Sequence, residues 1–119
     1  MITKRRIDLI TDGSGDATGF GEAATGFLYA VQLVDGDFAD GVDVTLTAEN
    51  SDLSIPLLVG ADWNSDKMLY PRVLQNLNTD ATALTTHALP IVYGRPKAVI
   101  AQGGDTKSGS VILYIVTEP

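Results

Sequence analysis

The chain has 119 residues, of which 45% are hydrophobic, and a formal net charge of −7 at pH 7. This length fits one domain with a single core, and no apolar run approaches the roughly 20 residues that span a bilayer. The acidic balance argues against nucleic-acid binding, because neutralising phosphates takes clustered Lys and Arg. Because the sequence has no cysteine, disulfides and thiolate chemistry are excluded.

The charges are unevenly distributed along the chain. Between Arg6 and Lys67 there are twelve acids and no Lys or Arg, whereas five bases and three acids follow from Lys67 onward. This pattern has two interpretations. An acidic surface would keep copies apart in solution, or acidic and basic regions would meet between subunits and set their orientation.

The first half of the chain predicts short β-strands. A weakly alternating strand at 7–10 is followed by Gly-rich loop chemistry through residue 22. Segment 26–34 is apolar on both faces, which predicts an inner strand. Segment 42–48 alternates between apolar and polar residues, as is typical of a half-buried antiparallel strand.

The middle of the chain is less regular. Segment 54–59 is a strand with a proline, which indicates an edge strand or the beginning of one. A loop at 62–66 and a short extended piece at 67–72 follow. For residues 73–88 we expect a polar excursion with one helical turn at most, because Asn, Asp and Thr crowd between the apolar positions.

The last part of the chain predicts strands at 89–93 and 97–102, separated by a turn at 94–96, and a final strand at 110–117 that pairs with 97–102 in a hairpin. The final strand is apolar at alternate positions on both sides: Val111, Leu113 and Ile115 on one, Ile112, Tyr114 and Val116 on the other. Such a strand lies in the middle of a sandwich or barrel, or another subunit covers one of its faces.

About eight short strands with little or no helix predict an all-β fold. We expect an antiparallel β-sandwich or barrel, jelly-roll-like, formed by residues 7–119 as a single domain. Residues 1–6 precede it as a basic N-terminal arm.

The sequence offers no catalytic site, cofactor site or metal site. His87, the only histidine, lies in the polar excursion with no nucleophile elbow nearby, and one histidine without cysteine does not make a zinc site. We therefore expect no enzyme. Two aspartate clusters leave calcium as an alternative to ordinary turn chemistry: Asp12 with Asp16, and Asp35, Asp37, Asp40 and Asp43.

Three stretches of the chain are similar to those of a known family. They are TDGSGDAT at 11–18, YPR at 70–72 and GRPKAVIAQGG at 94–104, the last before a Lys-Ser-Gly turn. The sequence resembles small structural proteins of tailed-bacteriophage virions. The resemblance implies a capsid cement or decoration protein, β-rich and homotrimeric, that bridges neighbouring major capsid subunits. It also implies a location on the capsid surface of the virion, after assembly in the host cytoplasm.

A cement protein predicts contact residues in place of an active site. We expect Lys4, Arg5 and Arg6 to contact acidic patches on the capsid or on a sister subunit, and the alternative is a disordered basic tail. Arg72 and Arg95 are further contact candidates.

Trp63 has two interpretations, an exposed aromatic for contact or a side chain folded over one end of the core, and the second is favoured. Two other classes of function stay open. A head–tail connector or tail component would share the β fold, whereas a carbohydrate- or host-binding module would use Trp63 and the aspartate loops.

Overall fold

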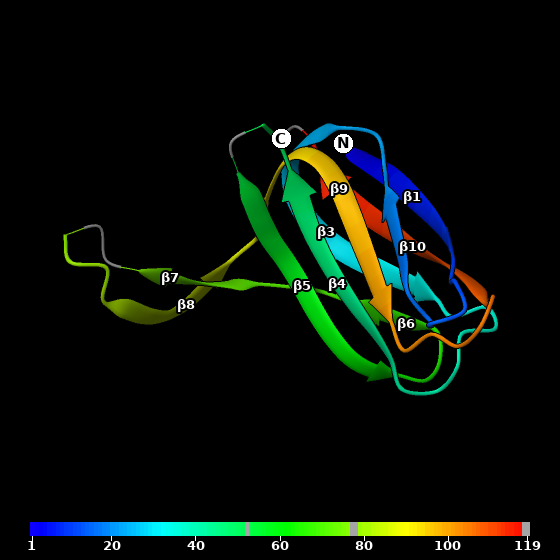
Figure 1. The fold of residues 1–119 in the computed structure, drawn as a ribbon. Helices are drawn as coiled ribbons and strands as arrows, with labels where there is room; N and C mark the ends of the chain where they lie inside the picture. The colour runs from blue at the N-terminus through cyan, green and yellow to red at the C-terminus, as the bar shows by residue number, and fades with distance from the viewer. Residues whose placement is uncertain (52, 77–78, 118–119) are drawn as a thin grey trace.

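A computed structural model describes residues 1–51, 53–76 and 79–117. Over these residues the chain forms ten β-strands and no helix (Figure 1). The strands are β1 (Ile2–Ile10), β2 (Ala17–Phe20), β3 (Ala24–Val34), β4 (Val42–Glu49), β5 (Ser54–Trp63), β6 (Lys67–Leu69), β7 (Val73–Asn76), β8 (Ala83–Ala88), β9 (Ile91–Ala101) and β10 (Ser108–Val116). The predicted all-β fold is confirmed.

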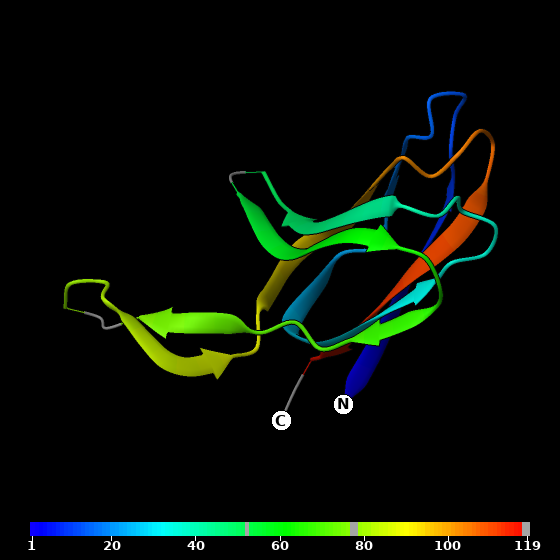
Figure 2. The ribbon, with the colours of Figure 1, turned by 90° about the horizontal axis from the view of Figure 1, so that it is seen from below.

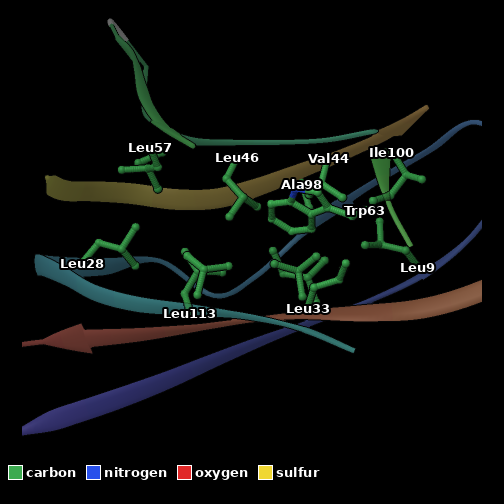
Figure 3. Close-up of a cluster of buried hydrophobic side chains, with 14 of the residues drawn as sticks. Leu9, Leu28, Leu33, Val44, Leu46, Leu57, Trp63, Ala98, Ile100 and Leu113 are labelled. Carbon is green, nitrogen blue, oxygen red and sulfur yellow. The ribbon is translucent and has the colours of Figure 1, made fainter. Parts of the chain in front are cut away.

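Eight of these strands form one antiparallel sheet that folds over into two layers. Its order is β1-β10-β3-β9-β4-β5, with β2 paired to β9 and β6 paired to β3, so the sheet is open and sandwich-like. One layer contains β1, β10, β3 and β6, and the other contains β2, β9, β4 and β5. Side chains from both layers meet between them and form the core (Figure 3).

Strand β9 connects the layers. Its residues 91–94 pair with β3, and its residues 95–101 pair with β4. The turn predicted at 94–96 is therefore wrong, because this segment bends without breaking the pairing. Gly94 permits the bend with a φ of 118°, and a Cβ there would collide with the carbonyl oxygen of Glu49.

Strand β10 lies inside its layer, between β1 and β3. The inward-facing side chains of Val111, Leu113 and Ile115 are fully buried, as the apolar pattern predicted. On the outer face, side chains of the neighbouring strands cover β10. The ammonium of Lys4 lies 5.7 Å from the ring centroid of Tyr114, and the Tyr114 hydroxyl donates to Gln32 Oε1 at 2.7 Å.

The predicted hairpin of the last two strands is wrong. Strands β9 and β10 do not pair, because β3 lies between them in the sheet order. Their connection crosses from one layer to the other and is held by neighbouring loops. The Gly103 N–H donates to the Gly15 carbonyl at 2.9 Å, and the Gly103 carbonyl accepts the Ala39 N–H at 2.9 Å.

The N-terminal arm expected at residues 1–6 is also wrong. Residues 2–6 pair with residues 112–116 as the first half of β1. The physical reason is that β10 would otherwise leave a row of backbone N–H and C=O groups unpaired. Farther along the same strand, Ile7 and Leu9 enter the core and hold β1 in place.

Residues 73–88, expected as a polar excursion, contain the two strands β7 and β8, which pair in a hairpin. This hairpin projects away from the two layers (Figures 1 and 2). The molecule accordingly measures 48 × 27 × 27 Å, with a radius of gyration of 14.9 Å, against about 13.5 Å for a compact domain of this length. In the described residues no helix is long and apolar enough to span a membrane.

Candidate interaction surface

The β7–β8 hairpin makes no sheet with the body of the protein. Within the described residues, β7 and β8 pair only with each other, and all their side chains are exposed except that of Ala88, which is half-buried. An isolated two-stranded hairpin is only marginally stable in water. The hairpin is therefore the part of the molecule with most to gain from a partner.

Both faces of the hairpin carry apolar side chains. Val73 lies opposite Ala88, and strand alternation places Leu84 on the same face. Leu74 lies on the other face, opposite His87. The three large apolar side chains are 37 to 46% exposed. His87 is thus a surface residue of the hairpin.

The base of the hairpin is fixed to β3. The rings of Tyr29 and Tyr70 pack edge to face with centroids 5.8 Å apart. The Arg72 guanidinium lies 5.6 Å from the Tyr29 ring centroid, and its Nη1 donates to the Tyr29 carbonyl at 3.1 Å. On the returning side, the Leu28 N–H donates to the Pro90 carbonyl at 2.9 Å. These contacts hold the direction in which the hairpin leaves the body.

Beside that base, apolar side chains cross the outer face of four strands. Ile2 pairs with Val116, Val116 with Phe27, and Phe27 with Ile91, and directly paired residues point to the same side of a sheet. Tyr93 continues this face along β9. Ile2, Phe27, Ile91 and Tyr93 are 48 to 56% exposed, and with Val116 we name them the outer apolar row.

The predicted basic contact residues do not form one patch. Lys4 and Arg6 pair with Tyr114 and Ile112, so they lie on the outer face of the first layer. Arg95 lies on the outer face of the second layer, with its guanidinium 4.2 Å from the Phe20 ring centroid. Arg5 donates to the carbonyls of Glu22 and Ala23, both at 3.2 Å.

The other basic side chains also make contacts within the chain. Arg6 Nε is 2.8 Å from Asp8 Oδ1, and its Nη2 donates to Ser110 Oγ at 3.1 Å. Arg72, as described, packs on Tyr29. Each of these side chains therefore has a structural partner in its own chain, whatever else it contacts.

Trp63 is 5% exposed and belongs to the core. Its indole ring lies over Gly60, where a Cβ would collide with it. The interpretation of Trp63 as an exposed aromatic is therefore wrong, and the favoured interpretation, a tryptophan folded over one end of the core, is confirmed. Position alone did not decide this, because the sequence placed Trp63 in a loop and the structure places it at the end of β5.

The aspartates gather in connecting loops, and several of them cap backbone N–H groups. Asp12 Oδ1 accepts the N–H groups of Ser14 and Asp16, at 2.8 and 3.1 Å. Asp37 Oδ1 accepts the Ser108 N–H at 2.6 Å. Among the described residues, no group of three or more His, Asp or Glu side chains is arranged to hold a metal ion.

Two of these aspartates have displaced pKa values. Burial, followed by repulsion from Asp66, Asp40 and Asp37, raises the pKa of Asp35, whose Oδ1 is buried and has no hydrogen-bond partner among the described residues. The hydrogen bond from the Ser108 backbone lowers the pKa of Asp37. The folded chain therefore disfavours the ionised form of Asp35 and favours that of Asp37.

Comparisons with protein-family models, with curated proteins and with solved structures found no match. The geometry alone therefore identifies the candidate surface, which consists of the hairpin and the outer apolar row. Sequence reasoning missed both parts. The signal for the hairpin was the Thr-rich segment at 83–88, because β-branched residues favour strands.

Proposed function

We propose that the protein is a non-enzymatic structural protein of a virion, a capsid cement that stabilises the head by bridging neighbouring major capsid subunits. The observation that carries this proposal is the β7–β8 hairpin, which leaves the body as a two-stranded ribbon and exposes both of its faces. The resemblance of segments 11–18, 70–72 and 94–104 to phage structural proteins is the reason for proposing a virion as the assembly.

The architecture suits this role physically. A subunit that binds only the assembled shell stabilises that shell by mass action. A rigid body with a projecting hairpin can cover the joint between two neighbours, because its contact surface lies outside its own compact layers. In this role the protein acts as a homotrimer on the capsid surface of the virion, and the virion assembles in the host cytoplasm.

One alternative loses its main support. A carbohydrate-binding module would use Trp63 to stack on a sugar, and this side chain is buried in the core. A head–tail connector or tail component would use the same projecting hairpin in a ring or a tube. Copy number separates it from cement, because cement occupies sites over the whole shell and a connector only one vertex.

The test is binding to shells assembled from the major capsid protein of the virus that encodes this chain. The wild-type protein should sediment with the shells in many copies per particle and raise their melting temperature. Val73→Ser with Leu84→Ser should weaken this binding, whereas Val59→Ser, at an apolar position 78% exposed on β5, serves as the matched control. Absence of binding, or binding at one vertex only, would overturn the cement proposal.

A further inference from the structure

We infer that the hairpin of one copy packs its apolar side chains on the outer apolar row of a second copy. This inference rests on the proposed structural role, because it names the contact by which copies of the protein would associate in that role. It assigns an occupant to two surfaces that the single chain leaves open, the hairpin faces and the row formed by Ile2, Val116, Phe27, Ile91 and Tyr93.

The single chain exposes more surface than a compact monomer of its mass. The chain has an accessible surface of 6707 Å², whereas a compact monomer of its mass exposes about 6,200 Å². The hairpin, which projects from the body (Figure 2), adds to this surface because nearly all of its side chains are exposed. Because monomers rarely leave contiguous apolar surface open, the hairpin and the row call for covering partners.

The hairpin and the outer apolar row match in size. A six-residue strand such as β8 spans about 20 Å, and a row across four strands spans about 14 Å. The hairpin is thus long enough to lie across the whole row. Val73 and Leu84, which share a face of the hairpin, would meet the side chains of Phe27 and Ile91.

The charges of the hairpin and of the face that bears the row favour contact between copies. The chain carries a net charge of −7, so two copies repel each other over most of their surface. Segment 73–88 contains no Lys or Arg, and its single acid is Asp80. The outer face that bears the row also carries Lys4, Arg6 and Asp8 on β1, with Asp8 paired to Arg6, so these three side chains leave one positive charge there. A nearly neutral hairpin with one negative charge is therefore the element best suited to approach this face of an acidic copy.

The hairpin and the outer apolar row are adjacent in the chain. The hairpin returns to the body through Leu89 and Pro90 and continues directly into Ile91, a member of the row. Each copy therefore presents its hairpin and its row side by side. In a trimer, each copy can place its hairpin on the row of the next copy, so that three head-to-tail contacts close a ring and cover all three rows. The contacts of Tyr29, Tyr70 and Arg72 preset the direction of the hairpin and reduce what is lost on ordering it.

Cysteine cross-linking in the full-length chain tests this contact, since the natural sequence has no cysteine. Two separately tagged variants, Leu84→Cys and Ile91→Cys, are mixed and oxidised. A disulfide between them joins a hairpin to another copy, because each variant holds only one of the two thiols. The matched control replaces the second variant with Val59→Cys, which lies on the outer face of the other layer. We expect the Leu84–Ile91 heterodimer and no Leu84–Val59 product.

Solution mass provides the second measurement. Leu84→Glu and Ile91→Glu should each raise the dissociation constant for self-association by at least about tenfold, whereas Val59→Glu should leave it unchanged. Thermal melts of all three variants serve as the control that each variant is folded. A wild-type chain that stays monomeric at every concentration overturns the inference, and so does undiminished self-association of Leu84→Glu.

Shell binding separates this inference from the proposed function. If the cross-link forms and the wild-type protein ignores capsid shells, the contact between copies stands and the cement role fails. If Leu84→Glu loses shell binding but keeps its self-association, the hairpin binds the capsid protein and the inference fails.

Discussion

The indole ring of Trp63 lies directly over Gly60, three residues earlier in β5, and occupies the space that any side chain at Gly60 would need. Ring and backbone can meet this closely only because glycine has no Cβ. This one contact explains why Trp63 is buried at the end of a strand when its neighbours Asp62 and Asn64 are exposed.

Gly60→Ala should therefore destabilise the protein. The added methyl group forces the Trp63 ring or the β5 backbone to shift, and such overpacking costs about 1–3 kcal/mol. The free energy of unfolding in urea measures the effect. Gly13→Ala is the matched control, because a Cβ at Gly13 comes only within 3.9 Å of Asp105 Oδ1. Equal stability of the two variants would contradict the packing described for Trp63.

The pattern of apolar residues along the chain predicted those strands that bury one or both faces. The doubly apolar β10 and the alternating β4 are clear in the sequence, because apolar residues fill every position of Val111–Val116 and every second position of 42–48. The pairing of these strands was not predictable from such patterns. Strand order depends on contacts between residues far apart in the chain, such as Ile2 with Val116.

The missed elements have physical reasons of their own. Gly94 and Pro96 indicate a turn wherever they occur together, but here they let one strand pass from layer to layer. The hairpin at 73–88 buries neither face in the single chain, so it shows no period-two burial signal.

The pH dependence of stability should show the contribution of the hydrogen bond between the Asp37 carboxylate and the Ser108 N–H. The Ser108 N–H bonds to this carboxylate and lowers its pKa below the ordinary value of 3.8. For an acid with a lowered folded-state pKa, the stabilisation is present above pH 3.8 and is lost as the pH falls through the folded-state value. Asp37→Asn should thus reduce the melting temperature at neutral pH, and its difference from wild type should vanish in acid. Asp16→Asn, which removes the same charge, is the control, and an equal loss in both would contradict the assigned hydrogen bond.

Asp35 should show the opposite sign. Burial and the neighbouring carboxylates raise its pKa above 3.8, so its ionised form weakens the folded state at neutral pH. Asp35→Asn removes that charge and should raise the melting temperature at pH 7. The gain should disappear as the pH falls below the unfolded-state value, where Asp35 of the wild type is protonated in both states. A loss of stability at pH 7 would show that the Asp35 carboxylate has a favourable partner instead.

The contact of Arg72 with Tyr29 should stabilise the β7–β8 hairpin and contribute little to the stability of the two layers. Arg72→Ala removes the guanidinium from the Tyr29 ring and the hydrogen bond to the Tyr29 carbonyl, contacts worth about 1 kcal/mol at an exposed site. Amide exchange in segment 73–88 should accelerate, while exchange in β3, β9 and β10 stays unchanged, because no core side chain is altered. Arg95→Ala is the matched control, since Arg95 also covers a ring, that of Phe20, but away from the hairpin. If both variants leave exchange in the hairpin unchanged, its direction is set by the Tyr29–Tyr70 packing and the backbone alone.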